Sequence, residues 1–402
     1  MMFGIDRLLA EPALRAPLKG RRVALLAHPA SVTENLTHTL DALVACNDIK
    51  ISAAFGPQHG LRGEKQDNMI ESPDFRDPVY GIPVFSLYGE VRKPTDAMMD
   101  TFDVLLVDLQ DLGCRIYTFI TTLRYVLEAA SRHRKAVWVL DRPNPVGRPV
   151  EGLMLRPGWE SFVGAGPLPM RHGLTLGELG LWFVRKLKFD LEYRLIEMQG
   201  WMPDNPPGFG WPSGLRAWIN PSPNAPNLWM ARAYAGTVMV EGTTLSEGRG
   251  TTRPLEQFGA PDIDARAVID AMKTLAPRWL DGCRLRECWF EPTFHKYAGK
   301  LCHGIQVHTE GPDYVHHTFK PWRAQALAFK AIRRLYPNYS LWRDFAYEYE
   351  RDRKAIDVIN GSQLLREWVD DISATPQDLD RLALADERAW TGEREQFIRY
   401  RN

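Results

Sequence analysis

Asp103-Val-Leu-Leu-Val-Asp-Leu109 is the most regular apolar run in the chain and decides the fold. A short, almost wholly apolar run of this kind is typical of a strand buried on both faces of a parallel sheet. Similar runs occupy 22–27 (RVALLA) and 135–140 (KAVWVL). Weaker runs at 51–56 and 83–87 predict two more strands.

Helical segments lie between these strands. The segment 33–45 follows polar Ser31, and 116–133 has apolar residues at helical spacing, among them Leu123 and Leu127. Alternation of strands and helices at this spacing predicts a parallel sheet with helices on both faces. No GxGxxG follows the run at 22–27, so the dinucleotide-binding fingerprint is missing and we expect no cofactor.

The second half begins after a loop rich in Pro, Gly, Asn and Trp at 201–226. Loops of this length in compact domains are usually binding loops or linkers. We expect one domain over 1–230 and a smaller α/β (α+β) domain over 231–402. Its expected strands are 237–240, 285–289 and 304–307, and its expected helices are 265–274, 324–335, a segment from 361 onward and a surface helix over 378–402.

The charge balance indicates which class of partner the protein binds. The 402 residues include 50 Lys plus Arg and 50 Asp plus Glu, which gives a formal net charge of zero. A balanced chain has no electrostatic footprint for nucleic acid or for an anionic membrane. We therefore expect a small-molecule partner rather than nucleic acid or membrane, and the sequence leaves the oligomeric state open.

The cysteines and the N-terminal sequence indicate the cellular location and bear on metal binding. The five cysteines contain no CxxC pair and fit free thiols in a reducing compartment. Their spacing with His303 matches no common zinc pattern, and His303 and His308 would point to opposite faces of a strand, so we expect no metal. The sequence has neither a secretory h-region nor an apolar run of the ~20 residues that a membrane helix requires. We expect a cytoplasmic protein.

Polar clusters follow three of the expected strands, at 56–64, 108–118 and 141–151. Ligands of parallel α/β sheets bind outside the carboxyl ends of the strands, so these clusters should meet at one edge of the sheet. A fourth cluster, 240–253, mixes Glu, Arg, Thr and Gly. It lacks the order of a phosphate-binding loop, and its carboxylates suit a polyhydroxylated or carboxylated ligand better than phosphate.

Seven ordered strings carry a specific family resemblance: PQHGLRGE, LYGEVRKPT, DVLLVDLQDLGCRIYTFITT, VLDRPNPVG, PMRHGLTLGEL, PSPNAPNL and VEGTTLSEGRGTTRP. Together they resemble the signature blocks of the DUF1343 family of exo-β-N-acetylmuramidases, over about residues 4–310. The resemblance implies a Rossmann-like N-terminal domain, a smaller C-terminal domain and an active site in the cleft between them. It also implies release of terminal N-acetylmuramic acid from peptidoglycan fragments during cell-wall recycling.

Glycoside hydrolysis usually needs two carboxyl groups, one of them a protonated acid. We expect Glu247 and Glu64 in these roles because both lie on Gly-flanked loops, and Asp108 is a third possibility at a strand end, where an Asp often caps a helix or pairs with Arg. Arginines suit the lactyl carboxylate of muramic acid, and aromatic rings suit sugar faces. The predicted substrate-binding residues are Gln58, His59, Arg62, Gln110, Arg115, Tyr117, Asp141, Arg142, Asn144, Glu151, His172, Asn224, Glu241, Arg249, Thr251 and Arg253.

Gln58 departs from the family pattern, which usually has Glu before His59. An amide has no titratable proton, so Gln58 cannot act as a general acid. Three functions stay open from the sequence: a muramidase that uses another carboxyl group, a hydrolase of another small glycoside, and a sugar- or muropeptide-binding protein without turnover.

Overall fold

A seven-stranded sheet occupies the first half of the chain, in the order β3-β4-β2-β1-β5-β6-β7. The structure is a computed structural model that describes residues 1–63, 65 and 69–401. Neighbouring strands pair in parallel, except that β3 runs antiparallel to β4. The strands are β1 (Arg22–Ala27), β2 (Lys50–Gly56), β3 (Phe75–Arg76), β4 (Pro83–Ser86), β5 (Val104–Asp108), β6 (Ala136–Leu140) and β7 (Tyr193–Ile196).

Helices cover both faces of this sheet, because successive residues of a strand point to opposite sides. Val104 and Leu106 of β5 pack in one apolar core with helices α1 and α3, and Leu105 and Val107 pack in another core with α4, α5 and α6. The predicted α/β class and the mostly parallel sheet are therefore confirmed. The helices are α1 (Gly4–Ala10), α2 (Pro12–Arg15), α3 (Thr39–Val44), α4 (Asp96–Met99), α5 (Phe119–His133) and α6 (Leu176–Lys186).

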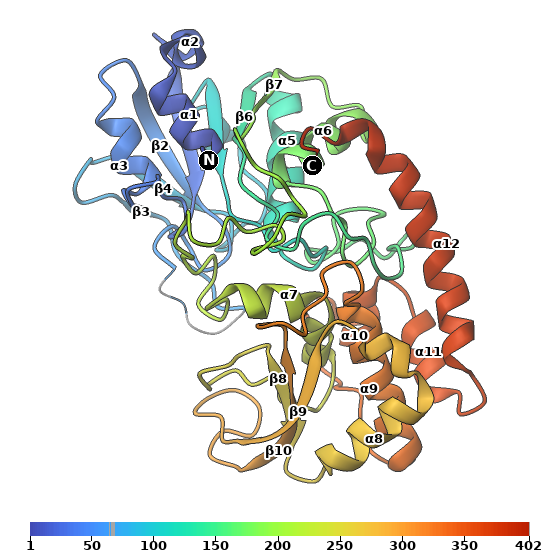
Figure 1. Ribbon diagram of the computed structural model, residues 1–402. Helices are drawn as coiled ribbons and strands as arrows, with labels where there is room; N and C mark the ends of the chain where they lie inside the picture. The colour runs from blue at the N-terminus through green and yellow to red at the C-terminus, as the bar shows by residue number, and fades with distance from the viewer. Residues whose placement is uncertain (64, 66–68, 402) are drawn as a thin grey trace.

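The second half holds a smaller antiparallel sheet in the order β8-β10-β9. Helix α7 lies between the two sheets (Figure 1), and its side chains join the core that α5 and α6 share. The predicted domain boundary at 230/231 falls inside this helix. The elements are α7 (Leu228–Thr237), β8 (Gln257–Ala260), α8 (Ala265–Leu275), β9 (Arg284–Phe290), β10 (Cys302–His308), α9 (Pro321–Leu335), α10 (Ala355–Asn360), α11 (Leu364–Asp370) and α12 (Pro376–Arg394).

The strand expected at 237–240 and the start of the helix expected at 33–45 differ from the structure. The strand expected at 237–240 is wrong, because α7 runs to Thr237 and Val238–Gly242 continues as a 3₁₀ helix. This apolar run is buried between neighbouring elements, which explains its composition without a strand. The helix expected from residue 33 begins only at Thr39, where the ring of His38 accepts a hydrogen bond from the amide of Leu40.

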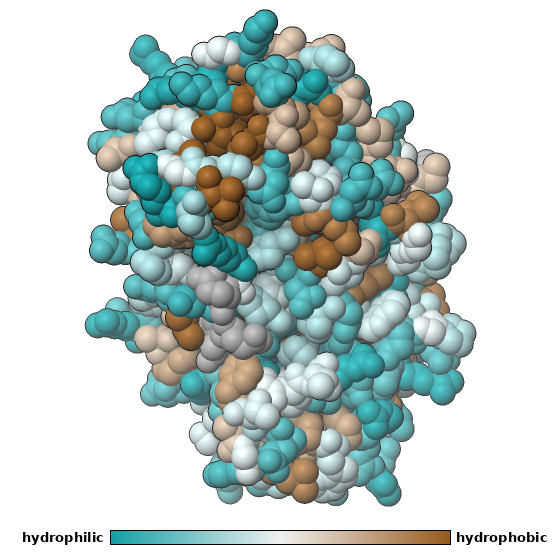
Figure 2. Space-filling view, turned by 90° about the vertical axis from the view of Figure 1, so that its left-hand side faces the viewer, coloured by the Kyte–Doolittle hydropathy of each residue, from teal (hydrophilic) through white to brown (hydrophobic). Residues whose placement is uncertain are grey.

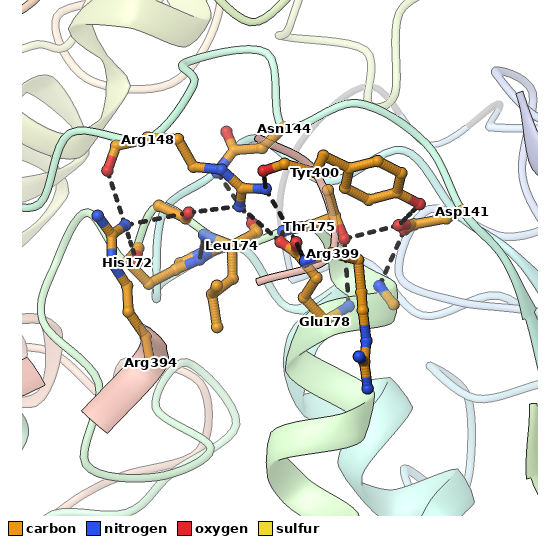
Figure 3. Close-up of polar contacts among 12 residues, drawn as sticks. Asp141, Asn144, Arg148, His172, Leu174, Thr175, Glu178, Arg394, Arg399 and Tyr400 are labelled. Carbon is orange, nitrogen blue, oxygen red and sulfur yellow. Dashed lines mark hydrogen bonds and ion pairs between the residues drawn. The ribbon is translucent and has the colours of Figure 1, made fainter. Parts of the chain in front are cut away.

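The end of the chain returns to the first domain. Helix α12 runs along one edge of the molecule from the smaller domain to the larger one (Figure 1). The hydroxyl of Tyr400 donates to Asp141 at 2.6 Å, and Arg148 joins the Tyr400 carbonyl to the Glu178 carboxylate (Figure 3). The prediction of a surface helix over 378–402 is therefore wrong for its last residues: the helix ends at Arg394, and Trp390 is fully buried.

Within the described ranges, no helix combines the length and the apolar content that a bilayer crossing requires. Figure 2 shows apolar patches mainly over the half of the visible face that holds the larger sheet, and a more polar surface over the other half.

Candidate active site

A small pocket lies where the carboxyl ends of β2 and β5 face the second domain. The first domain contributes residues of the turn after β2 and of the segment that leads into α5, and the second contributes α7, the 3₁₀ segment after it and the loop before α10. This is the sheet edge at which the sequence predicted a site. Its lining residues are Gln58, His59, Ile116, Tyr117, Thr118, Val163, Ser222, Asn224, Met230, Tyr234, Glu241, Arg249, Leu255, Tyr347 and Glu348.

A tight turn after β2 places Gln58 in the pocket. A Cβ at Gly56 would lie 2.5 Å from the backbone nitrogen of Leu61, so the turn has room only for glycine there. Gln58 is 7% exposed, and its amide oxygen accepts a hydrogen bond from the Thr118 hydroxyl at 2.8 Å. Its amide nitrogen donates to the carboxyl group of Glu348 at 3.4 Å.

Glu348 is the carboxyl group in this pocket with the properties of an acid. The hydroxyl of Tyr88 donates to Glu348 Oε2 at 2.8 Å, and burial, together with the charge of Glu241, raises the pKa of Glu348 to about 7. The backbone is left-handed at Glu348 (φ 47°) and at Tyr349 (φ 71°). Such a conformation costs non-glycine residues about 1–3 kcal/mol each and is concentrated at functional sites.

Glu241 supplies a second carboxyl group with a different environment. Its Oε2 accepts a hydrogen bond from the Tyr347 hydroxyl at 2.6 Å, and its Oε1 pairs with Arg249 at 2.5 Å. The adjacent carboxylates raise the pKa of Arg249. The guanidinium therefore stays charged beside Glu241.

Tyrosines form much of the remaining wall. The rings of Tyr117 and Tyr234 meet edge to face, with centroids 6.0 Å apart. Burial raises the pKa of each phenol well above its usual range, so both remain neutral. Apolar ring faces with hydroxyl groups at one end suit a ligand that has both apolar faces and hydroxyls, such as a sugar.

Six of the predicted substrate-binding residues meet in the pocket. They are Gln58, His59, Tyr117, Asn224, Glu241 and Arg249. The remaining ten, and the predicted catalytic carboxyl groups of Asp108 and Glu247, are not among its lining residues.

Asp108 is occupied by structural partners. Its carboxylate is fully buried, pairs with Arg142 through two nitrogens at 2.5 and 2.9 Å, and accepts from the Thr39 hydroxyl. These contacts join β5, the segment after β6 and α3. The arrangement is the strand-end pairing with Arg that the sequence left open as the alternative to catalysis.

Glu247 lies behind the pocket wall. Its fully buried carboxylate is 3.0 Å from Lys296 Nζ, 3.2 Å from His295 Nδ1 and 3.3 Å from Arg249 Nε. The two flanking cations and the histidine outweigh the cost of burial and hold the pKa of Glu247 far below its usual range. An ionised carboxylate of this kind cannot donate a proton near neutral pH, so Glu247 does not fit the protonated member of the predicted carboxyl pair.

Several predicted binding residues form hydrogen bonds with backbone groups and do not line the pocket. Arg115 donates to the carbonyls of Leu153, Leu168 and Ile359. Glu151 accepts from the first amides of α9, at Trp322 and Arg323.

Other predicted binding residues form hydrogen bonds or ion pairs with residues outside the pocket. Gln110 donates to the Asp111 and Pro143 carbonyls, and Asn144 donates to the Leu174 carbonyl. His172 accepts from the Leu174 amide, and Asp141 accepts from the hydroxyls of Thr175 and Tyr400. Thr251 donates to the Gly248 carbonyl, and Arg253 pairs with Glu256. Arg62 is exposed, with its guanidinium over the ring of Phe75. Glu64 lies outside the described residues.

Glu348 and Tyr347 were not predicted from the sequence. Both lie in the loop between α9 and α10, which follows no strand and belongs to no quoted family block. The only local signal is the alternation of Tyr and Glu at 347–350. Such an alternation is also common on solvated surfaces, so it does not identify a site by itself.

One cluster with metal-ligand chemistry lies away from the pocket. Asp204, His316 and His317 bring their ligand atoms within 4.8 Å of one another. His316 Nε2 is 2.9 Å from Asp204, and burial lowers the pKa of His316 to about 4. Arg148 and Arg394 lie beside the cluster, and their positive charges oppose cation binding.

Comparisons with known proteins agree with this architecture. Two family models match the chain: exo-β-N-acetylmuramidase NamZ, N-terminal, over residues 23–229, and exo-β-N-acetylmuramidase NamZ, C-terminal, over residues 232–400. The chain is 39% identical over 335 residues to the peptidoglycan β-N-acetylmuramidase NamZ of Bacillus subtilis (strain 168), which covers 83% of this chain and 78% of that relative.

Solved structures show the same fold over the full length. A DUF1343 family protein from Bacteroides fragilis NCTC 9343 has a TM-score of 0.86 at 28% identity, and a second from the same organism has 0.76 at 25%. Each comparison covers 100% of this chain and 99% of the other. The chain belongs to the DUF1343 family, the family of the exo-β-N-acetylmuramidase NamZ.

Proposed function

We propose that the protein is an exo-β-N-acetylmuramidase that releases terminal N-acetylmuramic acid from peptidoglycan fragments. The relationship to the Bacillus subtilis NamZ supports the reaction class. The observation that carries the proposal is the presence of two carboxyl groups with different environments, Glu348 and Glu241, in the wall of one pocket. A pair of carboxyl groups in distinct protonation states is what glycoside hydrolysis requires.

In the proposed reaction, Glu348 is the general acid. Its proton passes to the glycosidic oxygen while the bond from that oxygen to the anomeric carbon breaks, and the bonding electrons leave with the oxygen. Glu241, which pairs with Arg249, stabilises the positive charge that develops on the sugar ring and accepts a proton from the attacking water. The products are free N-acetylmuramic acid and the shortened fragment.

Gln58 contributes binding rather than proton transfer. Its amide is fixed by Thr118 on one side and by Glu348 on the other. The donor to Glu348 stays in place whether the carboxyl group is protonated or ionised. Gln58 therefore orients the acid that replaces the missing family glutamate.

Free thiols suit the expected location. Each of the five cysteines is unbridged, which fits a reducing compartment. The proposal therefore places the reaction on soluble muropeptide fragments in the cytoplasm, as a step of cell-wall recycling.

Turnover of a chromogenic β-N-acetylmuramide tests the proposal. We expect release of the chromophore by the purified protein above the blank, with matching β-N-acetylglucosaminide cleaved far more slowly. A folded protein that releases no chromophore would contradict muramidase activity. Calorimetric binding of muropeptide without turnover would instead support the sugar-binding function that Gln58 also allows, and cleavage of another aryl glycoside would support a different substrate.

A further inference from the structure

A second hollow adjoins the pocket and shares Glu348 with it. Two consecutive residues also contribute to both: Val163 lines the pocket, and Phe162 lines the hollow. We call this hollow the outer groove. Its walls include Arg92, Arg124, Tyr125, Phe162 and Tyr349.

The position of the outer groove follows the geometry of the reaction. A general acid protonates the oxygen that joins the released sugar to the rest of the fragment, so it stands between the two parts of the substrate. Glu348 lines both the pocket and the outer groove. A sugar that is released from the pocket therefore leaves its partner on the groove side of Glu348.

Aromatic side chains form a platform in the outer groove. Tyr349 is 55% exposed, although large aromatic residues are usually buried. The ring of Phe162 lies 6.2 Å from that of Tyr125. Rings of this kind stack on the apolar faces of sugars.

The exposed ring of Tyr349 is held in place. The guanidinium of Arg92 lies over the Tyr349 ring at 4.7 Å and over the Tyr88 ring at 3.9 Å. The Tyr349 hydroxyl also donates to Glu71 at 2.9 Å. The platform is thus preorganised, which lowers the entropy cost of binding.

The charges of the outer groove favour an uncharged ligand. Its cations Arg92, Lys93 and Arg124 are matched by carboxylates at Glu71, Glu90, Glu160 and Glu350. Arg92 and Lys93 are already paired, with Glu71 and Glu128. A polyanion would meet carboxylate repulsion there, whereas sugar hydroxyls can donate to carboxylates.

We propose that the outer groove is the leaving-group subsite and binds a neutral N-acetylated hexose, with Tyr349 as the residue that selects it. This inference rests on the proposed function. It adds a specificity element that lies outside the pocket for the released sugar. Tyr349 acts on the leaving group by stacking and takes no part in proton transfer.

The test compares two substrates that share the released sugar. One carries a small aryl leaving group, and the other carries N-acetylglucosamine with the natural linkage. For Tyr349→Ala we expect the ratio of kcat/KM for the disaccharide to kcat/KM for the aryl substrate to fall about tenfold, because stacking is lost for the larger group. Tyr349→Phe keeps the ring and should retain most of the ratio. Trp289→Ala removes an aromatic residue that is 59% exposed in the other sheet and should leave the ratio unchanged.

A binding measurement separates the two proposals. We expect saturation-transfer NMR to detect contact between the β-1,4-linked N-acetylglucosamine disaccharide and the wild-type protein, and Tyr349→Ala to lose the signal while Trp289→Ala keeps it. An unchanged ratio together with an unchanged signal in Tyr349→Ala would overturn the groove assignment. Lack of turnover of both substrates by wild type, with the signal intact, would overturn the muramidase proposal and leave the sugar-binding groove standing.

Discussion

The side-chain amide of Gln58 donates a hydrogen bond to the carboxyl group of Glu348, at 3.4 Å and across 290 positions of sequence. The contact joins the turn after β2 to a loop of the second domain. Gln58 has no titratable proton, whereas Glu348 has one, so the acid of the proposed reaction is assigned to Glu348.

Glu348→Gln tests this assignment with a nearly isosteric change. The variant keeps one acceptor oxygen for the donor of either Tyr88 or Gln58 and removes the titratable proton. General acid catalysis contributes about 10²–10⁴-fold to rate, so we expect kcat on the natural disaccharide to fall by that factor. Thermal unfolding should show a folded protein. A variant with nearly normal kcat would show that Glu348 is not the acid.

The pH dependence gives an independent test. Burial and the charge of Glu241 raise the pKa of Glu348 to about 7. The acid works only while protonated, so kcat/KM should be high below this pKa and should fall as the pH rises through about 7. We expect the alkaline limb in a pH–rate profile of the wild type. A rate that stays constant from about pH 6 to 9 contradicts the assignment.

Sequence and structure agree where local pattern decides. The apolar runs at 22–27 and 103–109 gave β1 and β5 because a strand buried on both faces needs little beyond length and apolar side chains. Gln58 and Tyr117 both line the pocket because the carboxyl ends of parallel strands share one edge.

The prediction and the structure differ where the role of a side chain depends on a residue distant in the sequence. Asp108 ends β5 and Gln58 follows β2 at the same edge of the sheet, yet Arg142, which follows the adjacent strand β6, pairs with Asp108. Glu348 reaches the pocket only because the second domain folds its loop over the first. No local spacing encodes either contact, so residue type and position alone could not assign their roles.

Gln58→Glu distinguishes an orienting residue from a disabled acid. The introduced carboxyl group would stand beside Glu348, and two neighbouring carboxyl groups raise the pKa of one of them. We expect the alkaline limb of kcat/KM to move to higher pH, with a change of less than about tenfold at acidic pH. An increase of about a hundredfold or more across the pH range would show instead that position 58 is the acid position.

The double variant Gln58→Glu with Glu348→Gln serves as its control. If Glu348 is the acid, the double variant should be as slow as Glu348→Gln alone. Recovery of wild-type turnover in the double variant would transfer the acid role to position 58. The same chromogenic and disaccharide assays read both proteins.

Glu247→Gln separates a structural carboxylate from a catalytic one. The change leaves Lys296 and Arg249 buried without their shared counter-charge, and breaking a buried pair in this way usually costs about 3–5 kcal/mol. We expect chemical denaturation to show a loss of that size in the free energy of unfolding. Glu287→Gln offers a matched control, because Glu287 pairs with Arg266 and His303 near the surface and should change stability little.

Turnover by Glu247→Gln tests whether this carboxylate has a catalytic role in addition to its structural one. Because Arg249 also holds Glu241, some loss of turnover is expected to accompany the loss of stability. Ligand or low temperature that restores the folded fraction should then restore most of the turnover. A variant as stable as the wild type but without turnover would return Glu247 to the catalytic role that its glycine-flanked loop first indicated.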